Sequence, residues 1–300
     1  MPKYSDTTLL HASKFSDTTK QIKRIIYSSI LDTGFAPKVA DIAQKLNISE
    51  EVTRASLHDL EGGIIIAMQN EQHADIKEFM GQKLPDDCVL PEVGEIYYAR
   101  PFANFKNHHH IIVDGEQKWY GECPIECSTI SYFFPGKEVV IRSVSHYTNE
   151  PIEIISKDGQ LLDYTPKGLS IHWGRPFGQW LGTKGHETDF IFPCDQNYFF
   201  STRDAHEEWE KSNPKEAGQG QLFHIIEINH LLRMFNYGHE RFDFQYHLPL
   251  IRFALAAIST GVTRIKMFTP IPNLFFLSIV KLVRDVHKYG YKLFLDVKPW

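Results

Sequence analysis

The chain has 300 residues, of which 42% are hydrophobic and 23% are charged, and its formal net charge is −5. These values are typical of a globular protein of one to three domains, and the negative charge gives no general attraction to nucleic acid or to an anionic membrane. The first residues lack the basic start and apolar run of a signal peptide, and no apolar stretch is long enough to span a bilayer. Four cysteines do not make a disulfide framework, so we expect a cytoplasmic protein with reduced thiols and no membrane partner.

Residues 1–80 are predicted to form a small helical domain with the pattern of a winged helix-turn-helix. Apolar side chains recur at helical spacing over residues 19–31 and again after Pro37, which suits the first turn of a helix. Asn47 then predicts a turn, and Ser49 can cap the next helix.

The helix capped by Ser49, the candidate recognition helix, is acidic. Glu50, Glu51, Asp59 and Glu61 stand against a single Arg54. A helix that tracks phosphates needs the opposite balance. The sequence therefore does not favour a nucleic-acid partner, and we expect this domain to pack on its neighbour instead.

Residues 81–212 are predicted to form a β-rich domain of the catalytic type, which makes the fold class α+β. Alternating apolar residues on both sides of Asp114-Gly115 indicate a hairpin with a two-residue turn. Residues 213–300 are predicted to form an α/β extension of unknown role, which begins with an apolar helix over about residues 221–236 and ends in a strand–helix–strand unit. Its apolar surface is a candidate homodimer interface or a cover for the active site.

The stretch Glu122–Cys127, ECPIEC, carries the strongest chemical signal. Pro124 suits the first position of a helix, so Cys123 is predicted to be its N-cap, with Glu126 and Cys127 crowding the first turn. A thiol at a helix N-terminus ionises more easily, and a carboxylate within hydrogen-bond reach can accept or deliver a proton. The set suits a soft metal or thiol-based proton chemistry.

Structural readings of the same residues remain open. Glu126 is at the N3 position of a capping box, and buried cysteines often behave as small hydrophobic residues. A structural zinc site is not expected because the spacing is C-x-x-x-C. His108–His110 are not expected to bind metal together, since adjacent side chains of a strand point to opposite faces.

Beyond single motifs, the order of elements over roughly residues 20–212 resembles the alkylmercury lyases (organomercurial lyases). That family joins a winged-helix-like amino-terminal region to a β-rich catalytic domain. Its Cys-x-x-Asp motif corresponds to Cys123–Glu126, and its second catalytic cysteine lies in a Phe-x-Cys segment followed by aromatics, a serine and a helix with His-x-x-Trp. Here the second segment is Phe192-Pro193-Cys194, followed by Phe199-Phe200-Ser201 and by His206–Trp209. The likeness also includes Pro101-Phe102 and the hairpin at Asp114-Gly115.

The resemblance implies protonolysis of a carbon–mercury bond, giving a hydrocarbon and Hg(II). It assigns Cys123 and Cys194 to the mercury of the substrate and Glu126 to proton handling. An external thiol would accept the mercury, and no organic cofactor is implied. Cys127 is either a third mercury ligand or, in our preferred reading, a packing residue.

Two tryptophans are expected to line the pocket around these cysteines. Trp119 comes just before the first motif, and Trp180 lies in the stretch FGQWLG. Core packing explains Trp180 equally well.

Three departures from the family pattern keep other functions open. The family aspartate is Glu126 here, the stretch Ser143–His146 lacks a cysteine that the family often has, and the last 80 residues have no counterpart in a standard lyase. The alternatives are a non-enzymatic thiol or metal sensor with a winged helix, and a divergent enzyme of the same fold acting on another sulfur- or metal-containing substrate.

Overall fold

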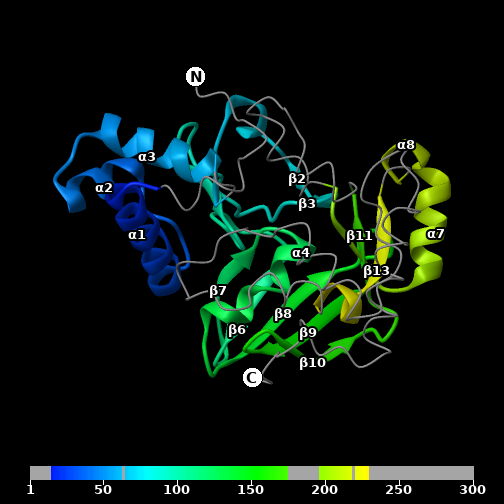
Figure 1. Ribbon diagram of the computed structural model, residues 1–300. Coiled ribbons are helices and arrows are strands. Elements are labelled where there is room, and N and C mark those ends of the chain that lie inside the picture. The colour runs from blue at the N-terminus through cyan, green and yellow to red at the C-terminus, as the bar shows by residue number, and fades with distance from the viewer. Residues whose placement is uncertain (1–14, 63–64, 175–195, 218–219, 230–300) are drawn as a thin grey trace, which may run out of the picture.

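A large antiparallel sheet lies at the centre of the molecule, with the N-terminal helices at one end and the two helices of residues 203–217 at the other (Figure 1). The computed structural model describes residues 15–62, 65–174, 196–217 and 220–229. The predicted strand–helix–strand unit of the last residues lies outside these ranges. No helix that the structure describes has the length and hydropathy of a membrane-spanning segment.

The three N-terminal helices form where the sequence predicts helices. They are α1 (Asp17–Thr33), α2 (Val39–Leu46) and α3 (Glu50–Gly62). Asn47, with φ of 53°, makes the turn between α2 and α3, and the Ser49 hydroxyl accepts the Val52 N–H at 3.2 Å. These two observations confirm the predicted turn and cap.

The central sheet has eight strands within the described residues, in the order β1-β4-β5-β7-β6-β8-β9-β10, and neighbouring strands in this order are antiparallel. Val113 pairs with Glu116 around Asp114-Gly115, whose positive φ angles of 54° and 82° suit a type I′ turn and confirm the predicted hairpin. The strands are β1 (Ile66–Met68), β4 (Ile96–Ala99), β5 (Phe102–Ala103), β6 (His110–Val113), β7 (Glu116–Gly121), β8 (Glu138–Val144), β9 (Pro151–Lys157) and β10 (Gln160–Thr165).

A second, smaller sheet stands beside α7 and holds three strands in the described residues, in the order β12-β11-β13. Here the sequence prediction is wrong in one place: Gln221–His224 form a strand that pairs with Ser170–Trp173, and helical residues begin only at Ile225. The elements are β11 (Ser170–Trp173), β12 (Tyr198–Phe200), α7 (Arg203–Ser212), α8 (Pro214–Ala217) and β13 (Gln221–His224).

Short elements connect these parts. They are the 3₁₀ turn η2 (Glu71–His73), the two-stranded pair β2 (Glu78–Phe79) and β3 (Gln82–Lys83), the single-turn helix α4 (Pro124–Cys127) and the 3₁₀ turn η3 (Ile130–Phe133). Of these, α4 follows directly on strand β7 and carries the candidate site.

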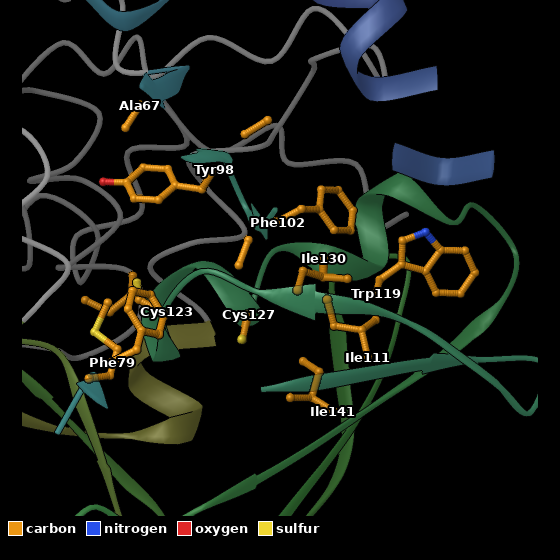
Figure 2. Close-up of a cluster of buried hydrophobic side chains, with 14 of the residues drawn as sticks. Ala67, Phe79, Tyr98, Phe102, Ile111, Trp119, Cys123, Cys127, Ile130 and Ile141 are labelled. Carbon is orange, nitrogen blue, oxygen red and sulfur yellow. The ribbon is translucent and has the colours of Figure 1, made fainter. Parts of the chain in front are cut away.

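Helix α1 is attached to the sheet region by two buried polar contacts. The Tyr27 hydroxyl donates to the Arg100 carbonyl at 2.6 Å, and the Trp119 indole N–H donates to the Ile30 carbonyl at 2.8 Å. One hydrophobic cluster runs from α1 through the sheet to β11 and β12, and it includes Cys123 and Cys127 (Figure 2). The N-terminal helices therefore share a core with the β-rich part.

Candidate active site

Cys123 occupies the N-cap position of α4, as the sequence predicts. Its backbone is extended, with φ −151° and ψ 166°, and Pro124 follows as the first helical residue. The Cys127 N–H donates to the Cys123 carbonyl at 2.8 Å and closes the single helical turn. The Cys123 side chain is fully buried and makes no capping hydrogen bond to the helix. Its sulfur is therefore placed by contacts outside α4.

One of those contacts is with Asn197, just before β12. The Asn197 side-chain nitrogen lies 3.7 Å from the Cys123 sulfur, and its side-chain oxygen accepts the Gly174 N–H at 3.1 Å. Asn197 is fully buried. The sulfur of Cys123 thus faces a hydrogen-bond donor on a neighbouring segment of the smaller sheet.

Two buried carboxylates flank Cys123 in sequence and meet one buried guanidinium. Arg100 lies 3.6 Å from a carboxylate oxygen of Glu122 and 3.9 Å from one of Glu126. The side chains of all three are at most 4% exposed. These ion pairs offset part of the cost of burying charge. We call Arg100, Glu122 and Glu126 the Arg100 cluster.

Two tyrosines hold Arg100 in place. Its guanidinium donates to the Tyr98 hydroxyl at 3.4 Å and lies 5.3 Å from the centre of that ring. Tyr27 binds its carbonyl and stacks on Phe133 at 5.4 Å. Burial raises the pKa of Tyr27 well above its usual value, and the nearby Glu126 and Glu122 raise it further. Tyr27 therefore stays a neutral hydrogen-bond donor.

Cys127 lies on the other side of the α4 turn, against the end of β7. A Cβ at Gly121 would come within 2.3 Å of the Cys127 sulfur, so the backbone and the sulfur are closely packed. Burial, then Glu126 and Glu122, raise the pKa of the Cys127 thiol well above its usual value. Both features agree with a protonated thiol in a packing role, as our preferred reading of the sequence has it.

Cys194 and Trp180 lie outside the described residues, so the pairing of Cys123 with Cys194 stays a prediction. The part of the same motif that follows is described: Phe199, Phe200 and Ser201 are buried at the end of β12, and His206 and Trp209 face them from α7. In the sequence, Cys194 stands three residues before Asn197 and four before the first residue of β12.

Trp119 is placed differently from the expectation that it lines a pocket around Cys123. Figure 2 shows Trp119 and Cys123 at opposite sides of the drawn cluster. Trp119 packs edge-on against Phe134 at 4.8 Å and lines a hollow of about 410 Å³ together with Leu31, Lys118 and Lys137. Its contacts in the described residues join β7 to α1.

The histidine tract also separates as expected for a strand. His109 is buried, and its ring nitrogen Nδ1 lies 2.8 Å from the Ser143 hydroxyl, whereas His108 and His110 are partly exposed. Burial lowers the pKa of His109 to about 3. No group of three or more histidine, cysteine or acidic side chains in the described part of the chain is suited to hold a metal ion.

Sequence reasoning missed three residues of this site: Arg100, Glu122 and Asn197. Glu122 stands inside the quoted motif, but nothing in its spacing shows that its side chain turns inward. Arg100 precedes the Pro101-Phe102 element, which gave the only available signal. Asn197 had none, because its contact with Cys123 joins residues 74 positions apart.

Fold and site together define the class: an α+β protein with a buried cysteine–carboxylate site on the first turn of a short helix. The family model described as "MerB: Alkylmercury lyase" matches residues 102–235, which include Cys123, Glu126 and Cys194. Over this segment the chain is similar to the alkylmercury lyase family.

A solved structure described as the mercury-bound form of MerB2 has a similar fold. The TM-score is 0.50 at 20% sequence identity, over 76% of this chain and 92% of that chain. No curated protein matches the sequence. At this identity the structural match bears on the fold, and the site must be argued from the residues themselves.

Proposed function

We propose that this chain is an organomercurial lyase, which cleaves carbon–mercury bonds by protonolysis and yields a hydrocarbon and Hg(II). One observation supports this function above others. The buried Cys123 begins α4, with the buried Glu126 in the same helical turn, inside the segment that matches the family model. A soft thiolate beside a proton-carrying group is the pair that this reaction needs.

The proposed reaction conserves mercury as Hg(II). The Cys123 thiolate binds the mercury of the substrate and displaces the small thiolate that was bound to this mercury. Cys194 then gives its proton to Glu126 as its own sulfur binds the mercury. The electron pair of the carbon–mercury bond takes that proton from Glu126, which releases the hydrocarbon and leaves Hg(II) between two thiolates for transfer to an external thiol.

Arg100 gives this proposal an electrostatic basis. Its guanidinium lies near the Glu126 carboxylate and keeps it in the protein interior, in the helical turn that Cys123 begins. Glu126 is one methylene longer than the aspartate of the family pattern. A fixed cation limits the directions that this longer side chain can take.

The other parts of the chain receive supporting roles in this proposal. The N-terminal helices are a winged-helix-like unit that packs against the β-rich part, and residues 213–300 are an extension that dimerises the protein or covers its site. A cytoplasm would supply the reducing conditions and the external thiol that accepts the mercury.

A headspace assay tests the function. Purified protein is mixed with methylmercury and excess thiol, and release of methane is followed. We expect release by the native chain and loss of at least about 100-fold in Cys123→Ser, Cys194→Ser and Glu126→Gln, since each removes a group that acts on the breaking bond. Cys88→Ser is the matched control, because Cys88 lies outside the proposed machinery, and it should release methane at the native rate.

The assay also separates the alternatives. Cysteine-dependent mercury binding without methane would contradict the lyase and favour a binding protein or an enzyme for another substrate. Binding of DNA by the mercury-free or mercury-loaded chain in a mobility assay would favour the sensor, which the acidic face of α3 does not suit.

A further inference from the structure

Asn197 is a polar side chain in a fully buried position, and its amide group joins two segments of the site. It reaches the Gly174 backbone at the end of β11 with its oxygen and the Cys123 sulfur with its nitrogen, at 3.1 Å and 3.7 Å. Burying an amide is costly unless both of its ends find partners. Here the partner of the nitrogen is the sulfur that the proposed reaction uses first.

The direction of the amide is fixed by its other end. A backbone N–H can only donate, so the atom of Asn197 that meets Gly174 must be the oxygen. The amide NH₂ is then the group turned towards Cys123. Gly174 permits this close approach, because a Cβ there would lie 2.3 Å from the Gln196 Cβ and 2.4 Å from the Gln196 carbonyl oxygen.

We propose that Asn197 is a positioning residue for Cys123: its amide N–H donates to the sulfur, directs it, and stabilises the negative charge on it during mercury capture. The inference rests on the proposed function for the choice of electrophile. In the capture step a lone pair of the Cys123 thiolate forms the sulfur–mercury bond. The bond from mercury to the carrier thiolate breaks, and the carrier leaves with that electron pair.

The test is the rate of methylmercury capture by the full chain, measured by rapid mixing with methylmercury bound to a small thiol. Subtraction of the rate of Cys123→Ser isolates the contribution of Cys123. Asn197→Leu removes the donor and the acceptor, while Asn197→Asp keeps an oxygen for Gly174 and turns a second oxygen towards the sulfur. We expect capture to slow by roughly tenfold or more in Asn197→Leu, because hydrogen bonds to charged groups are worth at least that factor, and to slow further in Asn197→Asp.

A matched control separates positioning from stability. Asn229 is also buried and donates to the Gly159 carbonyl at 3.3 Å. Asn229→Ala should lower the melting temperature and leave capture by the folded protein at the native rate. Asn197→Ser, which keeps a small donor, serves if Asn197→Leu does not fold, and it should recover part of the capture rate.

The outcomes are distinguishable from those of the function itself. Native capture rates in folded Asn197→Asp and Asn197→Ser would overturn the role of Asn197, whatever the methane assay gives. Slow capture in these variants supports it even if the native chain releases no methane, in which case the lyase alone fails.

Discussion

The protein buries ionisable side chains in two ways. In the Arg100 cluster, two carboxylates lie within 4 Å of one guanidinium, so charge is compensated by charge. Elsewhere, three histidines are held as neutral imidazoles: His109 on the Ser143 hydroxyl, His146 stacked on Tyr198 at 4.0 Å, and His206 against His172 at 3.0 Å. Burial lowers the pKa of all three.

The difference teaches where this fold keeps charge. Charged groups lie beside Cys123, where the proposed reaction moves a proton. The neutral imidazoles (His109, His146 and His206) fill the aromatic packing of the sheets and α7, where burial disfavours the charged form. The ion pairs of the Arg100 cluster can be tested by substitution, and the neutral imidazoles can be tested by lowering the pH.

The largest effect is expected from Arg100→Gln. Removing the guanidinium leaves the carboxylates of Glu122 and Glu126 without the ion pairs that they make with Arg100, and breaking a buried pair costs about 3–5 kcal/mol of unfolding free energy. Urea denaturation measures the loss. Arg142→Gln is the matched control, because Arg142 pairs with Glu153 at 3.0 Å on the surface with 62% of its side chain exposed, and it should cost less than about 1 kcal/mol. Equal losses of unfolding free energy in the two variants would mean that the buried ion pairs of Arg100 stabilise the protein no more than the exposed pair of Arg142.

The second-largest loss of stability is expected from acid, which protonates the neutral imidazoles. The pKa of His109 is about 3 in the folded chain against 6.5 for an ordinary histidine, so below pH 6.5 the unfolded chain takes up the proton first. Stability is therefore lost as the pH falls from 6.5 towards 3, and His109 alone accounts for about 2 kcal/mol by pH 5. Denaturation curves at pH 7 and pH 5 measure this difference.

His109→Asn provides the control for the acid effect. It keeps a polar group near Ser143 and removes the titrating ring, so the loss between pH 7 and pH 5 should shrink by that amount. An unchanged pH dependence in His109→Asn would show that other groups carry it.

The smallest effect is expected from Tyr27→Phe, which removes one neutral hydrogen bond to the Arg100 carbonyl and keeps the ring on Phe133. The loss should be about 1 kcal/mol, seen as a lower melting temperature. Tyr147→Phe, at a half-exposed ring, is the control and should melt with the native chain. A loss as large as that of Arg100→Gln would mean that Tyr27 is needed to keep the whole cluster in place.

Local signals in the sequence were enough to predict the hairpin at Asp114-Gly115, the cap at Ser49 and the N-cap position of Cys123. Each depends on a few neighbouring residues whose backbone preferences agree with the fold. The similarity to the alkylmercury lyases followed from the same kind of short motif, and the family model matches the segment that carries it.

Contacts between distant segments could not be predicted in this way. Strand β13 is a short apolar run that reads equally well as the start of a helix, and its pairing with β11 decides its conformation. Arg100 and Asn197 meet Glu126 and Cys123 because the fold brings segments together that are far apart in the sequence. The identity of these residues carries no local preference that would reveal their partners.

The two polar contacts of α1 have a consequence for synthesis of the chain. Tyr27 is made 73 residues before its partner Arg100, and Ile30 is made 89 residues before Trp119. At roughly 5–20 residues per second, helix α1 leaves the ribosome several seconds before either partner exists. The side of α1 that carries Tyr27 and Ile30 therefore waits for these partners in the nascent chain, whereas its contact with α3, through Thr19 and Asp59, can form earlier.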